Sequence, residues 1–194
     1  MNPALQAVLE ELERFGIEND RVKTEQSERM LNITRDTGEF LRVLIRASHA
    51  KSTLEIGTSN GYSTLWLAEA TAPFSGVVDT VEKSSHKFEL ARSNFDRSGL
   101  AQHIRPHLGD AGTFLKAQKS GSFEFIFLDS KRDEYLAWWS DIRRVLAKGG
   151  VLAVDNAISH PHEMADFVAA VKATPGFITA LVPVGKGEFL VQKD

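Results

Sequence analysis

Residues 54–63 read LEIGTSNGYS, the pattern of a buried strand that passes through a glycine turn into a helix. The apolar run ends at Ile56, and apolar residues at helical spacing resume from Thr64. Gly57 would let the backbone approach a ligand closely, and Gly61 would allow a tight turn into the helix. Because the first N–H groups of a helix have no partners within it, this turn is a candidate ligand site.

Alternating strand and helix patterns continue along the chain. Further apolar runs predict strands at residues 76–81, 103–108, 123–128 and 151–154. Each run is followed by a segment with helical spacing, at residues 84–97, 112–118, 133–146 and 162–172. Such alternation is typical of a parallel sheet with helices on both faces.

The last two predicted strands, at residues 177–182 and 188–191, are different. Only about five residues separate them, too few for a parallel crossover, so they must pair as an antiparallel hairpin. The predicted fold is a seven-stranded, doubly wound (Rossmann-like) α/β sheet, mostly parallel, with a C-terminal antiparallel hairpin. A nicotinamide-binding sheet would have six parallel strands instead.

The length of 194 residues suits a single domain. Within residues 1–194 we expect a helical N-terminal cap region at residues 1–50 and an α/β core at residues 51–194. Charges of both signs are interspersed at a net charge of −3, without the basic face of a nucleic-acid-binding protein. No apolar run approaches the ~20 residues of a membrane span. The lack of cysteine and of a signal-peptide pattern fits a cytoplasmic protein.

Acidic residues stand at the ends of the first three predicted strands, namely Glu55, Glu82 and Asp110. In an open α/β sheet, ligands bind beyond these strand ends. A carboxylate beside a Gly-x-x-x-Gly turn suits a cationic amino-acid ligand better than the diphosphate bound by Gly-x-Gly-x-x-Gly. Glu82 would accept two ribose hydroxyls, and Asp110 would reach an adenine amino group. A loop acid or a helix N-cap explains each residue alone, but the three together favour a ligand site.

Oxygen-bearing side chains also follow the fourth and fifth predicted strands. Asp129 ends one run, and Asp155 and Asn156 end the next. Adjacent parallel strands would bring the three side chains to one edge of the sheet. Three hard oxygen ligands without sulfur suit Mg²⁺ or a similar divalent cation. The alternative is a pair of unrelated acids at strand ends.

Several motifs taken together resemble the catechol and caffeoyl-CoA O-methyltransferase family, over roughly residues 30–193. They are LEIGTSNGYS at 54–63, VE at 81–82, GDA at 109–111, IFLD at 126–129, Tyr135, and GGVLAVDN at 149–156. The resemblance implies a methyltransferase fold that uses S-adenosyl-L-methionine and a divalent cation such as Mg²⁺. It also implies a small-molecule substrate, an aromatic vicinal diol methylated on one hydroxyl. A homodimer is expected on the same ground, with the N-terminal helices as its candidate interface.

The resemblance assigns roles to individual positions of this chain. The expected cofactor-binding residues are Leu31, Ile33, Glu55, Gly57, Thr58, Ser59, Gly61, Ser63, Glu82, Lys83, Asp110, Ala111 and Asp129. The expected metal ligands are Asp129, Asp155 and Asn156.

The catalytic position departs from the family pattern, which has a lysine three residues after the first metal-binding aspartate. This chain has Arg132 there, and arginine stays protonated in proteins, so it cannot accept a substrate proton. Three hypotheses follow. Lys131 acts as the base, or Arg132 acts only through its charge while metal and water take the proton, or the protein does different chemistry or none.

Other residues near these motifs are ambiguous. Trp138 and Trp139 are interpreted as packing residues of the helix at 133–146, and His160 and His162 as exposed imidazoles in a loop and helix start. His160 or His162 as a base or extra ligand is the alternative, because histidine titrates near neutral pH.

Overall fold

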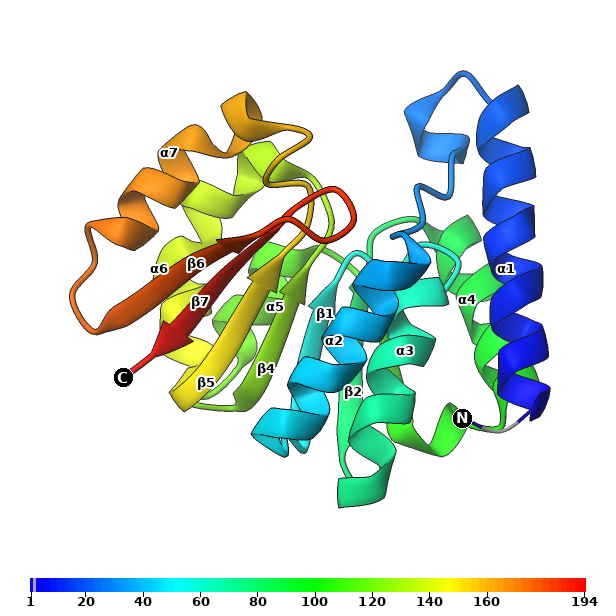
Figure 1. The fold of residues 1–194 in the computed structure, drawn as a ribbon, viewed down its shortest axis with the longest axis horizontal. Helices are drawn as coiled ribbons and strands as arrows, with labels where there is room; N and C mark the ends of the chain where they lie inside the picture. Colours follow the sequence, from blue (N-terminus) through cyan, green and yellow to red (C-terminus); the bar gives the residue numbers. More distant parts are fainter. Residues whose placement is uncertain (2) are drawn as a thin grey trace.

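The computed structural model describes residues 1 and 3–194 and contains one sheet of seven strands (Figure 1). The order across the sheet is β3-β2-β1-β4-β5-β7-β6, and β7 runs antiparallel to both of its neighbours. The strands are β1 (Ser52–Ile56), β2 (Val77–Glu82), β3 (Ile104–Leu108), β4 (Phe123–Leu128), β5 (Leu146–Val154), β6 (Phe177–Val182) and β7 (Glu188–Lys193). The predicted fold class is confirmed, including the C-terminal hairpin.

The strand order reverses between β1 and β4, and the register aligns the carboxyl ends of the central strands. Ile56 of β1 lies opposite Val81 of β2 on one side and Leu128 of β4 on the other. Leu128 in turn lies opposite Val154 of β5. The loops that follow these four strands therefore meet at one edge of the sheet, where open α/β sheets bind ligands.

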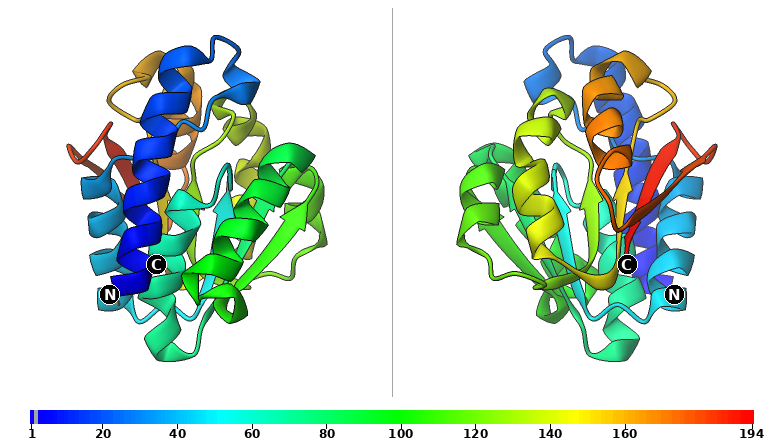
Figure 2. Two further views of the ribbon diagram at one scale, coloured as in Figure 1. Left: turned by 90° about the vertical axis from the view of Figure 1, so that its right-hand side faces the viewer. Right: turned by 90° about the vertical axis from the view of Figure 1, so that its left-hand side faces the viewer.

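Helices cover both faces of the sheet, as the end-on views show (Figure 2). Residues of α1 to α4 form one hydrophobic core, and residues of α5 to α7 form the other. Within β4, Phe125 and Phe127 belong to the first core while Ile126 and Leu128 belong to the second, the two-residue period of a strand. The helices are α1 (Pro3–Val22), α2 (Arg35–Ser48), α3 (Tyr62–Thr71), α4 (Ser85–Ser98), α5 (Ala111–Ala117), α6 (Tyr135–Val145) and α7 (Pro161–Lys172). Short 3-10 helices lie at Gln26–Glu28, Ala72–Phe74, Ala101–His103 and Arg132–Glu134.

Two elements extend several residues beyond the apolar pattern of the sequence. Apolar residues at helical spacing in the N-terminal region end near Gly16, but α1 continues to Val22. A Cβ at Gly16 would lie 2.5 Å from Asn32 Nδ2, so glycine lets the segment that returns over the helix pack closely. β5 begins at Leu146, several residues before the predicted start, and its register against β4 shifts between Phe123 and Phe125. None of the helices formed by residues 1 and 3–194 is long and apolar enough to cross a membrane.

Candidate functional site

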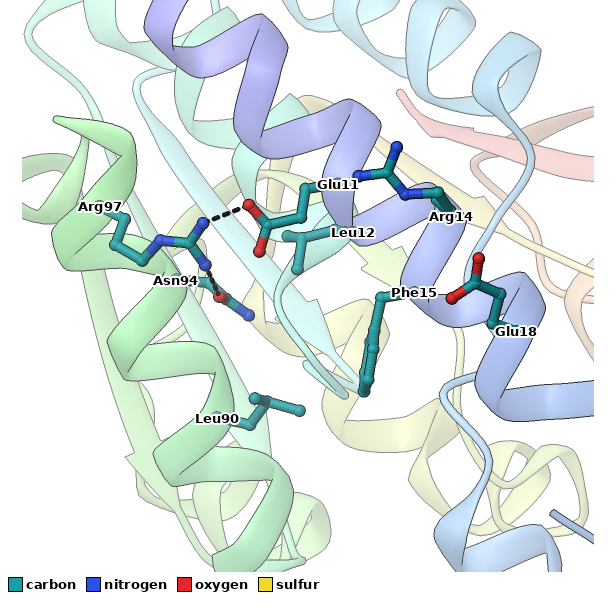
Figure 3. A pocket seen from close by; sticks show the side chains of 8 residues that line it. All are labelled: Glu11, Leu12, Arg14, Phe15, Glu18, Leu90, Asn94 and Arg97. Atoms are coloured by element: carbon teal, nitrogen blue, oxygen red, sulfur yellow. Dashed lines mark hydrogen bonds and ion pairs between the residues drawn. The ribbon is translucent and has the colours of Figure 1, made fainter. Parts of the chain in front are cut away.

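The main cavity lies at the carboxyl ends of the five parallel strands β1 to β5 and has a volume of about 790 Å³. Its walls come from the loops after these strands and from residues 26–33, a segment that we call the strap. A second hollow of about 340 Å³ lies between α1 and α4 (Figure 3). There Arg97 pairs with Glu11 and donates to Asn94, so part of the polar lining is already engaged. We therefore place the candidate site in the larger cavity.

The two glycines of the first loop are required for reasons that the sequence did not reveal. Gly57 has φ +107°, and a Cβ there would lie 2.0 Å from the carbonyl oxygen of Asp129, so it lets two loops pack together. Gly61 has φ +86°, and a Cβ there would lie 2.5 Å from the ring of Phe95 in α4. Gly57 lines the cavity, whereas Gly61 does not.

Glu55 lies behind this loop and is not part of the cavity wall. Its carboxylate accepts hydrogen bonds from the hydroxyls of Ser63 at 2.6 Å and Thr80 at 2.5 Å, and from the hydroxyl of Thr64. Burial raises its pKa to about 7, although the three hydroxyl donors oppose that rise. Glu55 therefore acts on the cavity through Ser63, which does line it.

Glu82 and Asp110 both line the cavity, and the backbone around them holds their carboxylates in place. Glu82 Oε2 accepts from the Ser59 amide at 2.9 Å, and Oε1 accepts from the Ser84 amide at 2.8 Å. Asp110 is the N-cap of α5 and accepts from the Thr113 amide at 2.8 Å, which lowers its pKa. A carboxylate oxygen has more than one lone pair, so both residues keep acceptor capacity for a ligand. Asp110 is thus both a helix cap and a wall residue.

The strap is attached to the core by hydrogen bonds to its backbone. Ser59 Oγ donates to the Met30 carbonyl at 2.6 Å, which joins the strap to the loop after β1. Lys87 Nζ donates to the Arg29 carbonyl at 2.6 Å. Asp20 accepts from the amides of Met30 and Leu31 at 2.7 and 2.8 Å. Leu31 and Ile33 line the cavity from the strap, where the family resemblance expected them.

Asp129, Asp155 and Asn156 meet at the ends of β4 and β5. Asn156 Nδ2 donates to Asp129 Oδ1 and to Asp155 Oδ2, each at 3.1 Å. Asp129 and Asn156 line the cavity, while Asp155 lies just beneath it with 2% of its surface exposed. Asn156 has φ +71°, a backbone conformation that asparagine tolerates better than most residues.

Glu188, at the start of β7, adds a further carboxyl to this cluster. It is fully buried, and neither of its carboxyl oxygens has a hydrogen-bond partner among the residues that the structure describes. Burial and the neighbouring charge of Asp155 raise the pKa of Glu188 to about 10. Burial and Asp155 likewise raise the pKa of Asp129 to about 8.

This donor set fits a divalent cation. Buried carboxylates that face one another destabilise the folded protein unless a proton or a cation neutralises them. Carboxylate and amide oxygens are ligands that Mg²⁺ accepts. Within residues 1 and 3–194 no three His, Cys, Asp or Glu side chains converge tightly enough to hold a metal. A cation held by this set would therefore need the amide of Asn156 as its third ligand.

Comparison with known proteins agrees with this geometry. A family model described as O-methyltransferase matches residues 4–193. The chain belongs to the O-methyltransferase family.

Individual relatives are of two kinds. Catechol O-methyltransferase of Mycobacterium tuberculosis is 35% identical over 126 residues, which cover 65% of this chain and 57% of that protein. The chain thus spans less than two thirds of that relative's length. Caffeoyl-CoA O-methyltransferase 1 of Eucalyptus globulus is 28% identical over 84% of this chain and 75% of that protein.

Solved structures show the same fold. The O-methyltransferase from Bacillus cereus in complex with SAH superposes with a TM-score of 0.82 at 24% identity, over 97% of this chain and 91% of that one. SAH-bound Podospora anserina methyltransferase superposes with a TM-score of 0.81 at 20% identity, over 100% and 89%.

Arg132, at the position where the family pattern has a lysine, is held in an ion pair. Arg132 Nε donates to Glu163 Oε2 of α7 at 2.7 Å, and the arginine side chain is only 15% exposed. Lys131 is 71% exposed and lies 3.3 Å from Asp133 Oδ2. Both residues line the cavity, and each is paired with a neighbouring acid.

Most of the expected site residues share the cavity wall. In addition to those already placed, Thr58, Ser59, Lys83 and Ala111 line it. The expected residues outside the wall are Glu55, Gly61 and Asp155.

The cavity also contains residues that the sequence did not assign to it. Trp138, interpreted as a packing residue, lines the cavity, whereas Trp139 is buried and donates to Thr174 Oγ1 at 3.1 Å. His160 lines the cavity beside Lys186 of the β6–β7 turn. Lys186 belongs to none of the sequence motifs, and only the geometry of the β6–β7 hairpin brings it to the site.

Proposed function

We propose that this protein is an S-adenosyl-L-methionine-dependent O-methyltransferase with divalent-metal assistance. Its acceptor is a small molecule, an aromatic vicinal diol, of which one hydroxyl is methylated. One observation carries the proposal: a single cavity joins the loop after β1 to the oxygen cluster after β4 and β5. The two reactants of a methyl transfer need such adjacent subsites.

The residues of the first subsite suit each part of the cofactor. The loop from Gly57 to Ser63 and the start of α3 supply free N–H groups and hydroxyls for the amino-acid portion. Glu82 has acceptor capacity for the ribose hydroxyls, and Asp110 for the adenine amino group. The strap covers this subsite with Leu31 and Ile33 and so excludes water.

The residues of the second subsite suit a cation and an acceptor. When bound, S-adenosyl-L-methionine supplies an electrophilic methyl group and Mg²⁺ supplies the Lewis acidity that lowers the acceptor pKa. Asp129, Asp155 and Asn156 would hold the cation. The Tyr135 hydroxyl accepts from the Ser130 amide at 2.7 Å and so fixes the loop that carries Asp129. Arg132 lines the cavity and its charge opposes the rise in the pKa of Asp129, which supports the hypothesis that this position acts through its charge.

Cofactor binding and methyl transfer are tested separately. Calorimetry with S-adenosyl-L-methionine comes first, followed by a transfer assay on a panel of catechols with Mg²⁺ or with EDTA. We expect binding, and turnover that EDTA abolishes.

Any other result of these two experiments contradicts a defined part of the proposal. Absence of cofactor binding would refute the whole proposal. Binding without turnover would favour a cofactor-binding protein that has lost transfer activity. The arginine at position 132, in place of the family lysine, is the reason to consider this alternative. Turnover that is indifferent to EDTA would indicate a metal-independent enzyme with another acceptor. The expected homodimer stays a prediction, to be checked by light scattering.

A further inference from the structure

The turn between β6 and β7 brings a lysine to the metal side of the cavity. Lys186 is half-buried and lines the same wall as Asp129, Arg132 and His160. The turn itself, residues 183–187, is far in sequence from every motif of the site. Its position therefore depends on how the hairpin is anchored.

Two neighbouring segments anchor this turn through hydrogen bonds. The Lys186 carbonyl accepts from the amides of Ile158 and Ser159 at 3.1 and 3.0 Å, which joins it to the loop after Asn156. On the other side, the Gly185 amide donates to Asp36 Oδ2 at 3.1 Å, which joins the turn to the start of α2. The backbone of Lys186 is thus held between the metal-side loop and the N-terminal helices.

Lys186 also differs from the other cations on this side of the cavity. Arg132 is paired with Glu163, and Lys131 is paired with the acids that follow it. Across residues 1 and 3–194, no hydrogen bond or ion pair engages the ammonium of Lys186. Lys186 lines the same cavity as Asp129 and Asn156 but comes from the β6–β7 turn. Its ammonium is therefore free to bind a ligand on the metal side of the cavity.

We propose that Lys186 binds the acceptor, with its ammonium donating a hydrogen bond to the hydroxyl oxygen that receives the methyl group. The inference rests on the proposed function. In the transfer, the oxygen–carbon bond forms as the sulfur–carbon bond breaks, and the bonding pair stays on sulfur. The acceptor proton has already left to solvent, so the oxygen is negative when it attacks. An ammonium at this oxygen stabilises the ionised acceptor.

The assignment explains how the chain functions with arginine at position 132. The family lysine is absent there, and the arginine that replaces it is engaged by Glu163. Lys186 lines the same cavity as Asp129 but comes from another element, so the fold brings an amine-bearing cation to the site from the β6–β7 turn.

The test compares three variants of the intact protein. Lys186→Met removes the charge, Lys186→Arg keeps it, and Lys148→Met removes a charge from an exposed lysine near the start of β5. Each is measured for S-adenosyl-L-methionine and Mg²⁺ affinity by calorimetry, and for kcat/KM with catechol as a function of pH.

For Lys186→Met we expect kcat/KM to fall by about 10- to 100-fold, the loss of one charged hydrogen bond. Its pH–rate profile should rise at higher pH than that of the wild type, because the acceptor loses a neighbouring positive charge. Affinity for S-adenosyl-L-methionine should stay within about twofold. Lys186→Arg should recover most of the lost rate, and Lys148→Met should match the wild type.

The other outcomes overturn the inference. Unchanged kinetics in Lys186→Met, while the wild type turns over, would refute it and leave the proposed function intact. A change in Mg²⁺ affinity alone would show that Lys186 serves only Asp129. Failure of Lys186→Arg to recover activity would exclude a role for charge. A wild type without methyl transfer to catechols would remove the proposed function, and this inference with it.

Discussion

At the scale of single residues, Glu55 is an acid at a strand end whose side chain lies in the protein interior and not in the cavity. Its side chain is wholly buried beneath the loop after β1 and bound by three hydroxyl groups. Its pKa is about 7 in the folded protein, compared with 4.5 for an unperturbed glutamate. The folded state therefore binds the proton more tightly than the unfolded state does. The stability associated with that proton is complete below pH 4.5 and is lost as the pH rises through about 7.

We predict that Glu55→Gln makes the free energy of unfolding less dependent on pH. The free energy of unfolding of the variant, relative to that of the wild type, should increase by about 3 kcal/mol between pH 4.5 and pH 8. This magnitude follows from the difference between the pKa values of about 7 in the folded state and 4.5 in the unfolded state. Urea denaturation at several pH values in EDTA measures it. Glu89→Gln, on the exposed side of α4, gives the baseline for removing a surface carboxyl. Parallel curves for the variant and the wild type would contradict the prediction.

At the scale of elements, the β6–β7 turn depends on glycines that pack against neighbouring segments. Gly187 has φ +94°, and a Cβ there would lie 2.4 Å from Ile158 Cγ1 and 2.7 Å from the Ile158 amide. Gly185 has φ +55°, and a Cβ there would lie 2.0 Å from Thr37 Oγ1. The turn that carries Lys186 is therefore wedged between the loop after β5 and the start of α2.

We predict that Gly187→Ala destabilises the protein by about 2 kcal/mol or more beyond Gly176→Ala. Gly176 has a similar φ of +82° but open space around it, so its variant isolates the backbone cost of about 1–2 kcal/mol. The additional loss comes from forcing a methyl group against Ile158. Denaturant unfolding of both variants measures the difference. Equal losses would show that the contact with Ile158 relaxes at no cost.

At the scale of the whole molecule, the sheet gathers buried carboxyl groups at one edge. Asp129 and Glu188 have pKa values of about 8 and 10, because burial and the charge of Asp155 disfavour their ionised forms. Without a cation, raising the pH therefore charges a buried cluster and destabilises the fold. A cation must displace these protons to bind, so its affinity rises with pH.

We predict that Mg²⁺ raises the Tm more at pH 8 than at pH 5.5. At about 100 times its Kd, a ligand contributes about 2.7 kcal/mol, which is worth roughly 5–10 °C for a domain of this size. Scanning calorimetry in Mg²⁺ and in EDTA measures the effect. Asp129→Asn should abolish the increment at both pH values. An equal increment at both pH values in the wild type would argue that the cation binds elsewhere.

Local patterns along the chain were enough to predict the architecture and the acids at the strand ends, and the family resemblance added further residues of the cavity wall. Apolar runs and helical spacing are short-range properties, and the five-residue connection between β6 and β7 permits only one pairing direction. The acids after β1, β2, β3 and β4 were found because parallel strands place their carboxyl ends together. The N-terminal strap was expected only through the family resemblance, because its residues form no local pattern.

The tertiary structure decided what the local patterns left open. It alone shows that Glu55 lies behind the wall, that Trp138 lies within it, and that Glu188 is buried beside Asp155. It also brought Lys186 to the same cavity as Asp129, about sixty residues away in sequence. These facts depend on which side chains meet across strands and loops distant in sequence. Burial and the charges of such neighbours set the pKa values of the site and decide which side chains remain unpaired. No short-range pattern of the sequence contains this information.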